Sequence, residues 1–238
     1  MGTARANVGW RALGAGAPQL ASRIARSLSG SGEAPVAELR RIRRGLSAVL
    51  REAPAGVVLG AARRLCRVPR RGFRFVACEL IRFHPGTPAL LDARRLERLG
   101  RGMSSWDQVD CFSVYLAGPA WRRGTLPEGA VHAWARSPDR WWRRAALVST
   151  VPLNSRAHGG AGDARRTLRV CRILESDRDP MVAKAMSWAL RELAKRDPGA
   201  VRGFLAERSG GLAALVRREV RNKLETGLKN PGRRRPDR

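Results

Sequence analysis

The chain has 238 residues and a mass of 26.1 kDa, enough for one domain or at most two, which excludes a small scaffold held together by disulfides or metals. Its 47 Lys and Arg residues against 20 Asp and Glu give a formal charge of +27, so nucleic acid is the leading class of partner. A hydrophobic fraction of 43% excludes a wholly disordered basic protein.

Arginine supplies nearly all of this positive charge, because lysine occurs only at positions 184, 195, 223 and 229. The planar guanidinium group suits phosphate oxygens, which favours a nucleic-acid partner. A GC-rich genome biases composition toward arginine in the same way, without any ligand. Composition alone leaves both explanations open.

Neither a membrane span nor a metal or disulfide framework is expected. No apolar run approaches the roughly 20 residues that cross a bilayer, because arginine interrupts every candidate. The three histidines lack paired-ligand spacing, and the cysteines lie far apart without a CxxC pair, at Cys66, Cys78, Cys111 and Cys171. The sequence predicts a protein without metal or cofactor, in a reducing compartment such as the cytoplasm.

The two ends of the chain differ in composition from its middle. Residues 1–34 are rich in Ala, Gly, Ser and Arg, which predicts a flexible basic arm. Residues 227–238 carry four Arg and two Pro, which predicts a disordered basic tail. The folded domain is therefore expected over residues 35–226.

Apolar residues recur at helical spacing through most of that domain, and alternating strand patterns are absent. One stripe lies within residues 36–50, and a second runs through Phe73, Val76, Ala77, Leu80 and Ile81. A capping residue followed by proline predicts helix starts at three places, Thr87-Pro88, Ser137-Pro138 and Asp179-Pro180.

Three of the helical segments align on Pro69, Pro138 and Pro180. The spacings are 69 and 42 residues, or about two periods and one period of roughly 35 residues, the range of HEAT or armadillo helix pairs. The predicted fold is all-α, a curved α-solenoid of HEAT-like helical repeats. The concave face of such a stack is free to line a positive groove for a DNA duplex.

The segment from Ser104 to Asp110, S-S-W-D-Q-V-D, contains the first candidate site. Its serines are expected to cap a helix on which Trp106 and Asp110 lie one turn apart, roughly 6 Å from each other on one face. The ordinary structural explanation is that Trp106 packs in the core and that Asp107 or Asp110 balances the helix dipole. Spacing alone favours that explanation.

Two further blocks place aromatic side chains among basic ones. They are W-W-R-R at residues 141–144 and K-A-M-S-W-A-L-R-E at residues 184–192. Aromatic rings beside cationic groups suit contacts with nucleic-acid sugars and bases next to phosphates. The candidate DNA contacts in these blocks are Arg143, Arg144, Lys184 and Arg191.

The three blocks together resemble the HEAT-like DNA alkylation repair glycosylases of the AlkD type, in the same order and at closely similar spacing, over about residues 70–226. The resemblance implies an active-site carboxylate at Asp110, aromatic companions at Trp106 and Trp188, and a DNA-contacting arginine at Arg144. Two departures stand out. Ser105 occupies a position where relatives commonly carry a second Trp, and residues before 70 show little similarity.

The activity implied is that of a base-excision-repair DNA glycosylase, which hydrolyses the N-glycosidic bond of cationic N3- or N7-alkylated purines in duplex DNA. The residues fit this chemistry, because a cationic base leaves without a general acid and one carboxylate suffices to stabilise the oxocarbenium-like sugar. Hydrolases of sugar polymers need two carboxylates, which argues against a glycan as the substrate. The expected partner is duplex DNA with alkylated bases, bound by a monomer that associates with the nucleoid.

Two alternatives remain at this point. One is a noncatalytic HEAT-like module that binds nucleic acid, and the other is a protein-interaction solenoid whose charge reflects genome composition. An interaction solenoid would spread its arginines evenly over the surface. A nucleic-acid groove would instead collect on its concave face Arg143, Arg144, Arg191, Arg217 and Arg221.

Overall fold

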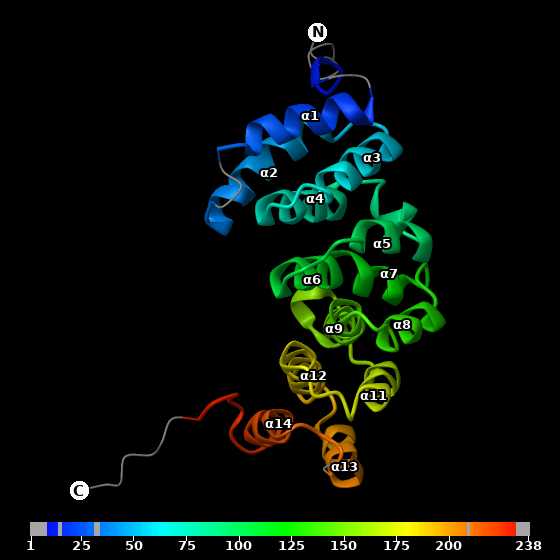
Figure 1. The fold of residues 1–238 in the computed structure, drawn as a ribbon, viewed down its shortest axis with the longest axis vertical. Coiled ribbons are helices and arrows are strands. Elements are labelled where there is room, and N and C mark those ends of the chain that lie inside the picture. The colour runs from blue at the N-terminus through cyan, green and yellow to red at the C-terminus, as the bar shows by residue number, and fades with distance from the viewer. Residues whose placement is uncertain (1–8, 14–15, 31–33, 209, 232–238) are drawn as a thin grey trace, which may run out of the picture. The chain divides into compact units, whose positions relative to one another are not determined.

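A computed structural model of the chain describes residues 9–13, 16–30, 34–208 and 210–231. Every regular element among these residues is a helix, and they contain no strand (Figure 1). None of the described helices is both long enough and apolar enough to cross a bilayer. The all-α class predicted from periodicity is therefore confirmed.

The chain divides into two compact units, residues 1–126 and 127–238. Periodicity predicted one domain over residues 35–226 and gave no sign of this division. The reason is that an apolar stripe shows which face of a helix is buried, but not which neighbour covers it.

The described residues of the first unit form seven α-helices, with short 3-10 and π segments before or between them. These are η1 (Arg11–Leu13), α1 (Ala17–Leu28), α2 (Val36–Leu50), α3 (Ala55–Leu65), α4 (Arg71–Phe83), η2 (Pro88–Leu90), α5 (Ala93–Gly100), α6 (Trp106–Phe112), the π-helix η3 (Ser113–Ala117) and α7 (Gly118–Arg123).

Helix α4 is the centre of the first unit, because it packs against α2, α3, α6 and η3. Its predicted apolar stripe is buried along its whole length, from Phe73 to Ile81. The stripe predicted for α2 is only partly buried, with Leu39 and Leu50 in the core and Val49 exposed. Of the two predicted stripes, the fully buried one thus belongs to the helix that packs against more elements of the unit.

Helix α1 lies inside the segment predicted to be a flexible arm. Its residues Leu20, Ile24 and Leu28 are buried, and the helix packs against α3. The backbones approach closely, because a Cβ atom added to Gly60 would lie 2.8 Å from the Cβ atom of Ala17. The prediction of a flexible arm is wrong for this helix. Its three apolar residues at helical spacing were missed because the segment as a whole is rich in Ala and Arg.

The ends of the chain fall largely outside the described residues. Residues 1–8, 14–15 and 31–33 of the predicted arm and residues 232–238 of the predicted tail are among those not described. Helix α14 (Ala214–Thr226) is followed by Gly227, whose φ of 74° is the left-handed conformation that glycine adopts at helix C-termini.

The part of the second unit that the structure describes also forms seven α-helices. They are α8 (Glu128–Ala135), α9 (Arg140–Val148), α10 (Val151–Asn154), α11 (Ala164–Ile173), α12 (Pro180–Leu193), α13 (Pro198–Arg208) and α14 (Ala214–Thr226), with the 3-10 turn η4 (Arg156–His158) after α10. Helix α12 is central here, because α9, α11 and α14 all pack against it.

In both units, several helices are capped by an aspartate whose carboxylate accepts a hydrogen bond from a backbone N–H in the first turn. The Asp179 carboxylate accepts from Met181 N at 2.8 Å, which confirms the predicted start of α12. Helix α9 is capped by Asp139 rather than by the predicted Ser137, and Thr87-Pro88 opens only a 3-10 turn. The other aspartates in this role are Asp92, Asp163 and Asp197.

We expect Asp179→Ala to lower the free energy of unfolding by about 1 kcal/mol, because two backbone N–H groups at the start of α12 lose their acceptor. Asp179→Asn keeps an acceptor oxygen while removing the charge that pairs with Arg140 at 3.6 Å. It should stay close to the parent in denaturant unfolding. Equal destabilisation by both substitutions would contradict the capping role.

Candidate nucleic-acid and catalytic site

Helix α6 presents the predicted tryptophan and aspartate on its outward face. Val109 and Phe112 of α6 are fully buried, and the helix packs against α4. The Trp106 side chain is 53% exposed, and Asp110 is partly exposed. The explanation of Trp106 as a core residue is therefore wrong.

The first turn of α6 is held by a different residue from the one predicted. Ser105 occupies the N-cap position, but its side chain makes no capping hydrogen bond, and its Oγ atom is buried without a hydrogen-bond partner. Instead, Gln108 Oε1 accepts from the Ser104 N–H at 3.0 Å. The arrangement is similar to one half of a capping box, except that the N–H belongs to the residue before the N-cap rather than to the N-cap itself.

Buried Arg74 on α4 fixes the chain just before α6. Its guanidinium donates to the carbonyl oxygens of Cys66 at 2.7 Å and Arg101 at 2.9 Å, and also to that of Leu99. The fork of the guanidinium group can serve several acceptors at once, which the single ammonium of lysine cannot do in the same geometry. Arg74 thus holds the C-terminal ends of α3 and α5. The chain runs from the end of α5 into α6.

After Phe112 the helix widens into the π segment η3. Gly118 N–H bonds the carbonyl of Ser113, five residues earlier. Pro119 explains the widening, because it has no N–H for the carbonyl of Tyr115 and its ring would clash with that carbonyl in an α-helix. The π segment sets the position of Tyr115, whose ring meets Phe75 of α4 edge-on with centroids 6.4 Å apart.

In the second unit, α12 carries three of the predicted site residues. Trp188 is half-buried, Lys184 is exposed and Arg191 is half-buried. Buried Glu219 on α14 accepts from Ser187 Oγ at 2.6 Å, and Arg191 Nε donates to the same hydroxyl at 3.1 Å. Burial lowers the pKa of the Arg191 guanidinium, while the charges of Glu219 and Glu192 oppose that change.

The two predicted arginines of α9 hold this helix to its neighbours. Arg143 Nε donates to the Asp177 carboxylate at 2.7 Å. Arg144 is buried, with 5% of its surface exposed, and donates to the Met181 carbonyl of α12 at 2.6 Å. Both guanidinium groups thus have structural roles that the sequence did not reveal, and their contact with DNA stays a prediction.

The two tryptophans of α9 have different surroundings. The Trp142 ring packs against Trp134 of α8 with centroids 5.0 Å apart, so it belongs to the packing of the second unit. Trp141 is half-buried, and the Arg140 guanidinium lies 4.8 Å from its ring centroid.

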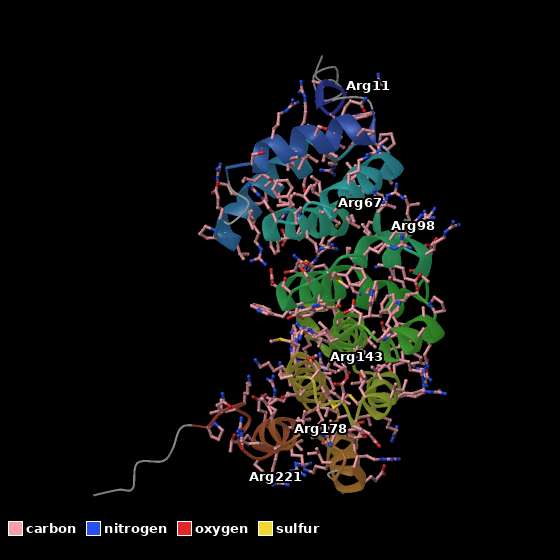
Figure 2. The ribbon with its side chains drawn as sticks, viewed as in Figure 1. Arg11, Arg67, Arg98, Arg143, Arg178 and Arg221 are labelled. Atoms are coloured by element: carbon pink, nitrogen blue, oxygen red, sulfur yellow. The ribbon has the colours of Figure 1, made fainter. Side chains whose placement is uncertain are left out.

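The candidate residues are divided between the two units. Trp106 and Asp110 share α6 in the first unit, while the second unit holds Trp188, Lys184 and Arg191 on α12 and Arg143 and Arg144 on the adjacent α9. Arginine side chains occur along both units, and those labelled in Figure 2 run from Arg11 to Arg221. Part of this charge is structural, as Arg178 shows by donating to the Gly211 carbonyl at 2.8 Å.

The described residues contain no cluster of three His, Cys, Asp or Glu side chains that could hold a metal ion. All four cysteines are free and buried. Burial raises the pKa of the Cys171 thiol to about 12, so this thiol stays protonated at neutral pH and is a poor nucleophile.

Comparison with known proteins identifies the class of this chain. The model of a family described as DNA alkylation repair enzyme matches residues 34–224. The match spans most of the chain, so the protein belongs to the DNA alkylation repair enzyme family, and the resemblance read from its three sequence blocks is confirmed. A search of curated proteins gives no match.

A solved structure supports the fold independently. The predicted DNA alkylation repair enzyme from Enterococcus faecalis superposes with a TM-score of 0.66 at 17% sequence identity, covering 85% of this chain and 95% of that one. At this identity the likeness establishes the fold, and the helical-repeat architecture predicted from the sequence agrees with it. The general role in DNA alkylation repair follows from the family.

The exposure of Trp106 leads to a prediction about stability. Trp106→Ala should change the free energy of unfolding by no more than about 0.5 kcal/mol, as at other surface positions. Trp121 of α7 is the matched control, because it is a tryptophan of the same unit with only 2% of its surface exposed. Trp121→Ala should cost about 3 to 5 kcal/mol. Denaturant unfolding of both variants measures the difference, and comparable losses would show that Trp106 supports the core.

Proposed function

We propose that the protein is a DNA glycosylase that hydrolyses the N-glycosidic bond of cationic N3- or N7-alkylated purines in duplex DNA. The observation that carries this proposal is the pairing of a 53% exposed tryptophan with an aspartate one turn later on α6, in a chain of the DNA alkylation repair enzyme family. Exposing a large indole to water is unfavourable, so a ligand is the natural partner of its free face.

The chemistry needs few protein groups. An alkyl group on N3 or N7 gives the purine a positive charge, and the electron pair of the breaking C1′–N bond neutralises the base as it leaves. The positive charge then develops on the sugar as an oxocarbenium ion. A carboxylate at Asp110 stabilises this charge, and water that it orients adds to C1′ and loses its proton.

The tryptophan acts on the same charge. The face of an indole ring attracts cations through its quadrupole, so Trp106 would stabilise both the cationic base in the bound lesion and the developing sugar cation. We assign the same role to Trp188 from the family resemblance. Arg144, Arg143, Lys184 and Arg191 are proposed as contacts to the phosphates, with Lys184 the most exposed of the four.

Asp110→Asn tests the role of the carboxylate, since it preserves the size of the side chain and removes its charge. Single-turnover excision from duplex DNA with one defined lesion should fall by about 10² to 10³. The effect should be larger for a 7-alkylguanine than for a 3-alkyladenine, because the less stable adduct leaves with less assistance. Folding should be retained, as judged by circular dichroism and denaturant unfolding.

Asp107→Asn is the matched control, because it makes the same chemical change on the same helix at a position that is also partly exposed. Its excision rate should match that of the parent protein if Asp107 only favours the helix N-terminus. An Asp110→Asn rate equal to the parent, with folding intact, would remove Asp110 from the mechanism.

A further inference from the structure

A second group of aromatic and basic side chains lies in the first unit outside the Trp106 and Asp110 pair. It is built on α2, α4 and η3, and none of its members was singled out by the sequence. We call it the Phe83 cluster, and it consists of Arg40, Arg43, Phe75, Glu79, Arg82, Phe83 and Tyr115.

Buried Glu79 anchors the cluster. Its two carboxylate oxygens accept from Arg40 Nε at 3.2 Å and from Arg43 Nε at 3.0 Å, while the Glu79 side chain itself is only 2% exposed. A buried carboxylate is stable only when it is paired and hydrogen-bonded, so both arginines are held in place on α2. The three positive charges of Arg40, Arg43 and Arg82 exceed the one negative charge of Glu79. The cluster therefore carries a net positive charge.

Phe83 is the exposed member of the cluster. Its side chain, at the end of α4, is 48% exposed, and two guanidinium groups lie near its ring. The Cζ atoms of Arg43 and Arg82 are 4.1 and 5.0 Å from the ring centroid. A surface aromatic ring beside cations is a combination that binds single-stranded nucleic acid, with a base on the part of the ring that the guanidinium groups leave exposed and phosphates on the arginines.

Tyr115 connects the cluster to the helix that carries the candidate site. The Arg82 Cζ atom lies 4.6 Å from the Tyr115 ring centroid, and Arg40 Nη2 donates to the Tyr115 hydroxyl at 3.4 Å. These contacts raise the pKa of Arg40, first through the hydrogen bond with Tyr115 and then through Glu79, so its charge is permanent. Tyr115 belongs to η3, which continues directly from α6.

We infer that the Phe83 cluster binds an unpaired segment of DNA, with one base stacked on Phe83 and the adjoining phosphates on Arg40 and Arg82. An acidic peptide would match the charge of the arginines, but its carboxylates offer nothing to the exposed ring. A nucleotide supplies both an anion and a flat aromatic surface. The inference concerns binding alone and does not depend on the proposed excision.

Binding of two labelled strands by the full chain, followed by fluorescence anisotropy, tests this inference. The strands are an oligothymidine of about 12 nucleotides and an abasic strand of the same length, which has the same phosphates and no bases. The parent should bind oligothymidine about tenfold more tightly than the abasic strand, the effect of stacking one base. Phe83→Ala should remove this preference and leave affinity for the abasic strand unchanged.

Two further variants complete the design. Val49→Ala removes an apolar side chain of α2 that is 39% exposed and outside the cluster, and it should bind both strands as the parent does. Arg82→Gln removes a phosphate contact and should weaken both strands to a similar degree. Circular dichroism checks that each variant is folded.

Equal binding of both strands by the parent would overturn the inference, as would a Phe83→Ala variant that keeps the preference for oligothymidine. Binding of a polyglutamate peptide as tightly as oligothymidine, with the same loss on Phe83→Ala, would also overturn it, since the partner would then be an acidic protein segment. Each of these binding results has the same meaning whether or not the protein excises bases.

Discussion

The burial of α4 is the constraint on which the first unit depends. Its apolar stripe packs against α2, α3 and α6, and its buried Arg74 holds the chain segments that end α3 and α5. Helix α6 packs on α4 and buries Val109 and Phe112, while Trp106 on the same helix is 53% exposed and Asp110 is partly exposed. Helix α4 ends with Phe83, so this one buried helix positions both the candidate catalytic pair and the Phe83 cluster.

The arginines of this chain divide into those that hold the fold together and those that remain at its surface. Arg74, Arg143 and Arg144 donate to backbone carbonyls or to a carboxylate of a neighbouring element, and each is buried or nearly so. Guanidinium groups are suited to this because several acceptors can be satisfied from one side chain. A net charge of +27 therefore overstates what is available to bind DNA, and the exposed side chains, such as Lys184, are the better candidates for phosphate contacts.

Patterns that depend on near neighbours in the chain were predictable from the sequence. The stripe of α4, the aspartate at the start of α12 and the shared face of Trp106 and Asp110 all follow from helical spacing and capping rules. Contacts between distant residues were not predictable. Arg144 donates to the carbonyl of Met181, 37 residues away, and Glu79 pairs with arginines 36 and 39 residues away. The exposure of Trp106 was also hidden, because spacing shows the side of a helix on which a residue lies and not what covers that side.

We propose that Trp106 and Asp110 on α6 serve the removal of an alkylated base. Mass spectrometry of the products formed by the parent protein on a duplex with a single 7-methylguanine tests it most directly. The expected products are free 7-methylguanine and a strand with an abasic site, with no reaction on the unmodified duplex. Binding of the duplex with the lesion still attached, or restoration of guanine by loss of the methyl group, would contradict it.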